Sequence, residues 1–186
     1  MRWDLLFGDF ETQMHAATAQ EMERHINELA RVEASQLTLA EALRGGIGVQ
    51  LTVLMCNGIT VHGVVRRVEP QWTLLTEGNR SVLVPLAKIL RVQGVGAQRG
   101  KASSKVPFTL AAALRILARN RSSVVLDVDS TRPVNLRGVL DQVGADYVQL
   151  MQLTDGVSRE RGNNQGSVVV PLAALVTVTS STEDQF

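Results

Sequence analysis

The chain has 186 residues, of which 45% are hydrophobic, 20% charged and only 4% aromatic, and its formal net charge is +1. This composition is typical of a globular chain that is long enough for one shared core or two small ones. So few aromatic rings argue against a platform that stacks single-stranded bases. The single cysteine, Cys56, excludes an internal disulfide and a cysteine-rich metal site, and it fits a reducing cytosol.

The N-terminal segment predicts an amphipathic helix. Residues 9–36 contain no Gly or Pro, and apolar residues recur there mostly at steps of three and four. This spacing predicts one long helix of about seven turns, with Asp9 as its N-cap. Its apolar stripe is expected either to pack on the rest of the chain or to pair with a second subunit in a homodimer. The candidate interaction residues are Phe10, Met14, Met22, Ile26 and Leu29.

No membrane or export signal is recognisable in the sequence. The apolar stretch at residues 3–7 is too short for the core of a signal peptide, and acidic residues interrupt and follow it. No other window approaches the roughly 20 apolar residues of a membrane-spanning helix. We therefore expect a cytoplasmic protein that does not enter a membrane.

The rest of the chain consists of two copies of one sequence repeat. The phrase Val-Leu-Val-Pro-Leu-Ala at 82–87 returns as Val-Val-Val-Pro-Leu-Ala at 168–173. Upstream, Gly63 is answered by Gly138 and Thr38 by Thr109, so the offset grows from 71 to 75 to 86 along the unit. Growth confined to turns is typical of two diverged copies of one fold.

Each copy predicts a short helix followed by five short strands. In the first copy a capping box at 38–41 begins the helix, and strands are expected near 49–55, 59–68, 72–76, 80–84 and 89–92. The proline of the repeated phrase ends strand four, and one tight helical turn precedes strand five. In the second copy the helix is expected at 109–119 and the strands near 123–129, 134–143, 146–151, 167–170 and 175–179.

The predicted fold is mainly β: a long N-terminal helix and two tandem five-stranded barrels, each preceded by a short helix. The expected domains are a helix at 1–37, a first barrel at 38–92, a linker at 93–107, a second barrel at 108–179 and a disordered tail at 180–186. We favour a pseudo-twofold pair of barrels in which strand four of one pairs with strand five of the other, because this leaves fewer exposed sheet edges.

A glycine in strand two and a Val-Pro turn before strand five resemble the Sm-like and SH3-like small barrels over residues 38–92 and 109–178. The layout as a whole also resembles a family of actinobacterial proteins, to which we assign no activity, that begin with a similar Met-Arg-Trp-Asp stretch. In the Sm proteins that bind RNA, an Asp and an Asn follow the strand-two glycine and a basic-Gly pair lies in strand four. Here the first two places hold Glu69 and Thr73 in one copy and Gly144 and Val148 in the other, so the uridine pocket of that family is absent.

The sequence contains no recognisable catalytic, metal or cofactor motif. No His-Glu-x-x-His, paired Cys, phosphate loop or Gly-x-Ser-x-Gly elbow is present. Cys56 and His62 flank the predicted Asn57-Gly58 hairpin, but a nucleophile also needs an orienting group and an oxyanion site. We expect a protein that is not an enzyme and that carries no cofactor.

Two further groups of residues are candidates for binding. Trp72 and Tyr147 occupy equivalent places at the start of strand three, where a large ring serves either the core or an exposed recognition surface. Residues 78–126 contain nine Lys or Arg and no acidic residue, which reads either as a solvated surface or as an anion-binding patch. The candidate anion contacts are Arg99, Lys101, Lys105, Arg115, Arg119 and Arg121.

Two functions remain open from the sequence. The first is an interaction or scaffold module that binds a protein partner through the barrels and the N-terminal helix. The alternative is an Sm-like RNA-binding protein that uses the basic segment, with weak sequence preference and mainly phosphate contacts.

Overall fold

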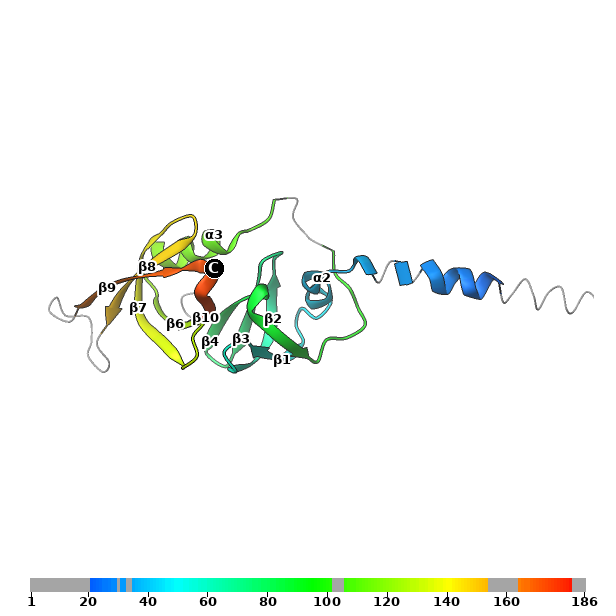
Figure 1. The fold of residues 1–186 in the computed structure, drawn as a ribbon, viewed down its shortest axis with the longest axis horizontal. Helices are drawn as coiled ribbons and strands as arrows, with labels where there is room; N and C mark the ends of the chain where they lie inside the picture. Colours follow the sequence, from blue (N-terminus) through cyan, green and yellow to red (C-terminus); the bar gives the residue numbers. More distant parts are fainter. Residues whose placement is uncertain (1–20, 30, 33–34, 102–105, 154–163, 182–186) are drawn as a thin grey trace, which may run out of the picture. The chain divides into compact units, whose positions relative to one another are not determined.

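The computed structural model describes residues 21–29, 31–32, 35–101, 106–153 and 164–181. Two units can be distinguished along the chain, one up to Thr38 and one from Leu39 onwards. The first contributes helical backbone, and the second contains all the strands in the described part of the chain (Figure 1).

The prediction of one long N-terminal helix is not upheld. Within the described residues helical backbone is found at 21–29, 31–32 and 35–36, and the remainder of the predicted helix lies outside them. Met22, Ile26 and Leu29 are all more than half exposed. An isolated helix is marginally stable in water unless its apolar face packs on something, so the sequence periodicity alone is a weak basis for a long helix.

The second unit follows the predicted order of elements closely. In the first repeat the elements are α2 (Leu39–Arg44), β1 (Gln50–Met55), β2 (Thr60–Val68), β3 (Trp72–Glu77), β4 (Arg80–Pro85), the 3₁₀ turn η1 (Leu86–Lys88) and β5 (Ile89–Gln93). In the second repeat they are α3 (Leu110–Arg119), β6 (Ser123–Val128), β7 (Val134–Val143), β8 (Tyr147–Leu153), β9 (Asn164–Pro171), the turn η2 (Leu172–Ala174) and β10 (Leu175–Ser181). The ten strands and the turn before each fifth strand are therefore confirmed, although the way the strands assemble differs.

The prediction of two closed barrels is wrong. The ten strands form one open antiparallel sheet with the order β5-β1-β2-β3-β4-β10-β6-β7-β8-β9. Strand four of the first repeat pairs with strand five of the second, with Leu83 opposite Val178 and Ser81 opposite Ser180. This pairing, which we favoured from the sequence, joins the repeats head to tail along one continuous ladder.

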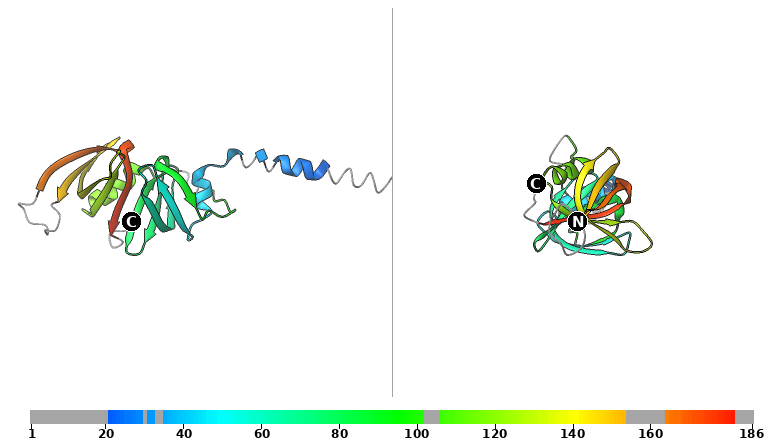
Figure 2. Two further views of the ribbon diagram at one scale, coloured as in Figure 1. Left: turned by 60° about the horizontal axis from the view of Figure 1, so that its bottom comes forward. Right: turned by 90° about the vertical axis from the view of Figure 1, so that its left-hand side faces the viewer.

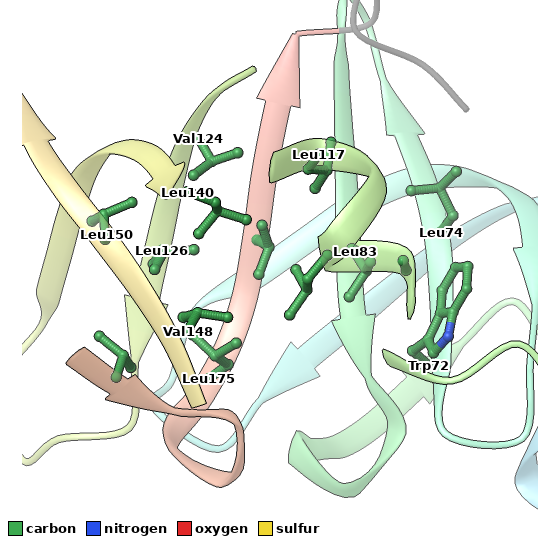
Figure 3. Packing of buried hydrophobic residues seen from close by; sticks show 14 residues of the cluster. Trp72, Leu74, Leu83, Leu117, Val124, Leu126, Leu140, Val148, Leu150 and Leu175 are labelled. Carbon is green, nitrogen blue, oxygen red and sulfur yellow. The ribbon is translucent and has the colours of Figure 1, made fainter. Parts of the chain in front are cut away.

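The central position of β4 explains why the sheet does not divide into two barrels. Its Val82 and Val84 belong to the core of the first repeat, whereas Leu83 belongs to the core of the second. Successive side chains of a strand point to opposite faces, so one apolar run serves both cores. Figure 3 shows Leu83 and Leu74 of the first repeat beside Leu117 of α3, and Val176 of β10 packs in return into the first core.

Phe108, which follows the linker, packs on the first repeat and forms a hydrogen bond with it. The indole Nε1 of Trp72 donates a hydrogen bond of 2.8 Å to the carbonyl oxygen of Phe108, and the two rings meet edge to face at 5.7 Å. The guanidinium of Arg67 lies 4.8 Å from the centre of the Phe108 ring and forms an ion pair of 2.8 Å with Glu69. These contacts position Thr109, whose hydroxyl accepts a hydrogen bond from the Ala112 N–H and caps α3.

The strand-two glycines permit close approach of strand three. A Cβ on Gly63 would lie 3.0 Å from the carbonyl oxygen of Thr76, and one on Gly138 would overlap the carbonyl oxygen of Met151. No other residue type fits this approach without moving the backbone.

Candidate functional site

A groove with a cavity volume of about 770 Å³ lies between the two repeats. Its walls come from the turn at 85–88, the turn that contains Leu172 and Ala173, the N-terminal half of α3, and the short segments 70–71 and 145–146. The two turns are the two copies of the repeated phrase. The head-to-tail joining of the repeats therefore brings the most similar parts of the two copies into one site, which we call the inter-repeat groove.

Equivalent hydrogen bonds hold the two turns of the inter-repeat groove in place. The N–H of Leu86 donates to the carbonyl oxygen of Gln71 at 2.9 Å, and the N–H of Leu172 donates to that of Asp146 at 2.7 Å. Ala87 and Ala173, one residue further along, are both exposed at the groove. Fixed turns that carry small side chains leave the apolar walls open to a ligand.

Three charged side chains border the apolar walls. Arg115 on α3 donates a hydrogen bond of 2.9 Å to the carbonyl oxygen of Gly144, so its guanidinium is held over the turn between β7 and β8. Asp146 lies in the same turn, and Lys88 lies at the end of η1. The border therefore contains both signs of charge.

Lys88 also links the two repeats. Its Nζ lies 2.6 Å from Oδ2 of Asp129, at the end of β6. This hydrogen bond from Lys88, followed by its positive charge, lowers the pKa of Asp129. Cys56 lies beside the pair, and burial, followed by the negative charge of Asp129, raises the pKa of its thiol. A raised thiol pKa means less thiolate at neutral pH, so these contacts do not activate Cys56 as a nucleophile.

Trp72 and Tyr147 differ although their places in the repeat are equivalent. Trp72 is fully buried: its ring packs in the core, and its indole nitrogen donates a hydrogen bond to Phe108. Tyr147 is half-buried, and its ring lies directly over Gly144. Of the two roles that the sequence left open for Trp72, the structure therefore shows the core role and not an exposed recognition ring.

The candidate anion contacts fall into two groups. Arg99 and Lys101 lie beside α2, where the N–H of Gly100 donates to the carbonyl oxygen of Glu41, and Arg99 donates to the carbonyl oxygens of Gly96 and Gln98. Arg115, Arg119 and Arg121 belong to α3 and its C-terminal end. Both views of the ribbon show α2 and α3 against different repeats (Figures 1 and 2). Lys105 lies outside the described residues.

The remaining candidate interaction residues belong to the N-terminal unit. Phe10 and Met14 lie outside the described residues, whereas Met22, Ile26 and Leu29 lie on one exposed helical segment. Their pairing with a second subunit stays a prediction.

The described residues add no metal or membrane site. They contain no group of three or more His, Cys, Asp or Glu that could hold a metal ion. In that same part of the chain, no helix has the length and apolar character needed to cross a membrane. His62 contacts Thr52 at 3.0 Å across the β1–β2 ladder, rather than Cys56.

Comparison with protein-family models, with curated proteins and with solved structures found no match to this chain. The resemblance to actinobacterial proteins therefore stays a prediction from the sequence, whereas the closed barrels implied by the resemblance to Sm-like proteins are not found.

Sequence reasoning did not select the groove residues Ala87, Lys88, Ala173 and Asp146. For Ala87 and Ala173 the signal was the repeated phrase, which we used to define the repeat and its strand ends, whereas Lys88 and Asp146 had no such signal. The sequence favoured the pairing of strand four with strand five, but it did not reveal that this pairing brings the two distant copies of the phrase to one groove.

Proposed function

We propose that the protein is a cytoplasmic, non-enzymatic interaction module that binds a segment of another protein in the inter-repeat groove. The observation that supports this proposal most strongly is the composition of the groove. Leu86, Leu110 and Leu172 give it apolar walls, and its volume lies within the range of about 300–1,000 Å³ found for ligand sites.

The polar groups at the groove favour binding over chemistry. Thr109 supplies a hydroxyl, but this hydroxyl already caps α3, and the guanidinium of Arg115 is engaged with Gly144. The described lining has no His, Cys or Ser, so it offers no nucleophile with a neighbouring base. An apolar side chain of a partner, flanked by charged residues of either sign, suits such a site.

The same composition disfavours a nucleic acid in the groove. Phosphate contacts need a surface of one sign, and Asp146 places a negative charge at the border. The groove walls also carry no aromatic ring on which a base could stack. The RNA-binding alternative would therefore have to use the basic residues of α3 outside the groove.

Two alanines allow the groove to be filled without disturbing the core. Ala87→Arg and Ala173→Arg each add a long side chain at an exposed position of the groove, and Ala97→Arg adds the same side chain at an exposed position outside it. The three variants and the unchanged protein, immobilised in equal amounts, are used to recover partners from a native lysate of the source cells.

We expect the unchanged protein and Ala97→Arg to recover the same protein partner, and each groove variant to lose it. Recovery of the same partner by all four would contradict binding in the groove. Recovery of stoichiometric nucleic acid with no protein would contradict the proposed function and favour the RNA-binding alternative.

A further inference from the structure

The pairing of β4 with β10 inside the sheet shows how two types of strand in this chain fit together. Within one chain, strand four of the first repeat (β4) pairs with strand five of the second (β10). The outermost strands of the sheet are β5 at one end and β9 at the other. These are strand five of the first repeat and strand four of the second, so the chain ends in the same two strand types that it joins in its middle.

The repeat offset gives the equivalent residues directly. An offset of 86 relates Leu83 of β4 to Val169 of β9, and Val178 and Val176 of β10 to Val92 and Leu90 of β5. At the internal junction Leu83 is 1% exposed and Val176 is 0% exposed. At the two ends of the sheet, Val169 is 60% exposed and Leu90 is 65% exposed. Apolar side chains that the internal junction buries are thus present, and uncovered, on both outer strands.

The protection of the two outer strands is slight: each carries a bulge, but the bulge at Leu90 of β5 is repeated at Val176 of β10, which still pairs with β4. Sheet edges are commonly blocked by charged side chains, bulges or covering elements. From Gly166 to Pro171 strand β9 has no charged residue, and β5 has only Arg91. In the described residues β9 pairs only with β8, and β5 only with β1.

We propose that β9 of one molecule pairs antiparallel with β5 of a second copy of this chain, reproducing the β4–β10 junction between molecules. Transfer of the internal register places Val92 of one copy opposite Val169 of the other, and Gln93 opposite Val168. The occupant is a second copy, because the chain itself shows that these two strand types fit and each molecule offers one of each. The contact is head to tail, so it extends into a ring or an open chain.

A head-to-tail contact has a signature that a symmetric dimer lacks. Leu90→Lys blocks β5 but leaves β9 usable, and Val169→Lys blocks β9 but leaves β5 usable. A contact needs one usable β5 and one usable β9. Neither variant alone supplies both, but a mixture does, because one variant supplies β9 and the other supplies β5. A symmetric contact between two β5 strands or two β9 strands would leave one of the two variants fully able to associate.

The experiment measures molar mass by sedimentation velocity on the full chain at about 100 µM, a hundredfold above a micromolar dissociation constant. The samples are the unchanged protein, each variant alone, their equimolar mixture and the control Ile47→Lys. Ile47 is 53% exposed in the turn after α2 and belongs to neither outer strand. Circular dichroism shows whether each variant is folded.

We expect the unchanged protein and Ile47→Lys to form the largest assemblies, each edge variant to form smaller ones, and the mixture to reach about twice the mass of either variant alone. Equal masses for the unchanged protein and both edge variants would overturn the proposal. So would a mixture no larger than its components, or full assembly by one edge variant alone. If an edge variant fails to fold, Leu90→Glu and Val169→Glu replace the pair under the same criteria.

Discussion

At the scale of single residues, substitution of Gly138 tests how closely β7 and β8, strands two and three of the second repeat, pack together. A Cβ at this position would overlap the carbonyl oxygen of Met151, which belongs to the backbone and cannot swing aside. We expect Gly138→Ala to lower the free energy of unfolding by about 1–3 kcal/mol, the usual cost of overpacking. Urea denaturation measures the change.

Gly96→Ala is the matched control for Gly138→Ala. A Cβ on Gly96 would meet no atom within 4 Å. Its effect should stay within about 0.5 kcal/mol, as for an ordinary surface position. Equal effects of the two substitutions would show that strand three does not approach Gly138 as closely as described.

Cys56 offers a test of the charges that link the repeats. Burial and the carboxylate of Asp129 raise the pKa of the thiol above its ordinary value of 9.0. Because only the thiolate reacts, alkylation by iodoacetamide should be slow at neutral pH and should accelerate with a midpoint above pH 9.0. Asp129→Asn removes the negative charge and should move the midpoint down. A midpoint below the ordinary value in the unchanged protein would contradict this description of the site.

Trp72 and Tyr147 mark a limit of sequence reasoning at this scale. Equivalent places in two repeats predicted equivalent roles, yet of the two rings only Trp72 is covered by Phe108, which comes just before the second repeat unit. The covering residue comes from outside the repeat, so comparing the two copies with each other could not reveal it.

At the scale of elements, the strands were predictable because their signals are local. The Asn57-Gly58 turn and the proline at the end of each strand four each define one boundary, and β1 to β10 agree with the prediction to within three residues. The N-terminal helix was less predictable, because helical periodicity does not reveal whether another surface is available to cover the apolar stripe.

The basic end of α3 provides the test of the RNA-binding alternative. Arg115, Arg119 and Arg121 belong to one helix and its end, separate from Arg99 and Lys101 at α2. If this surface neutralised about four phosphates, the log-log slope of affinity against salt would lie near −3 to −4. If this surface does not bind RNA, changing Arg119 and Arg121, which do not line the groove, to Gln leaves the salt dependence of RNA affinity, measured by fluorescence anisotropy, unchanged. A measurable flattening of the slope would favour the alternative.

At the scale of the whole molecule, the sequence predicted two similar folds but not their fusion into one sheet. Val82-Leu83-Val84 and Val168-Val169-Val170 are almost the same three residues, yet the first run is buried throughout and the middle residue of the second is exposed. The difference comes from position in the sheet, central for β4 and outermost for β9, and strand order is a long-range property. The inter-repeat groove and the uncovered edges both follow from this order.

The joining of the two repeats through β4 and β10 is therefore tested most directly by Leu83→Ala followed by amide hydrogen exchange, resolved by peptide. Leu83 lies on a strand of the first repeat but packs in the core of the second, so its truncation should cost about 2–5 kcal/mol. We predict faster exchange both at 50–93 and at 123–153, with the exposed-site control Ile47→Ala leaving both unchanged. Acceleration confined to 50–93 would show that the repeats are independent and would contradict the continuous sheet.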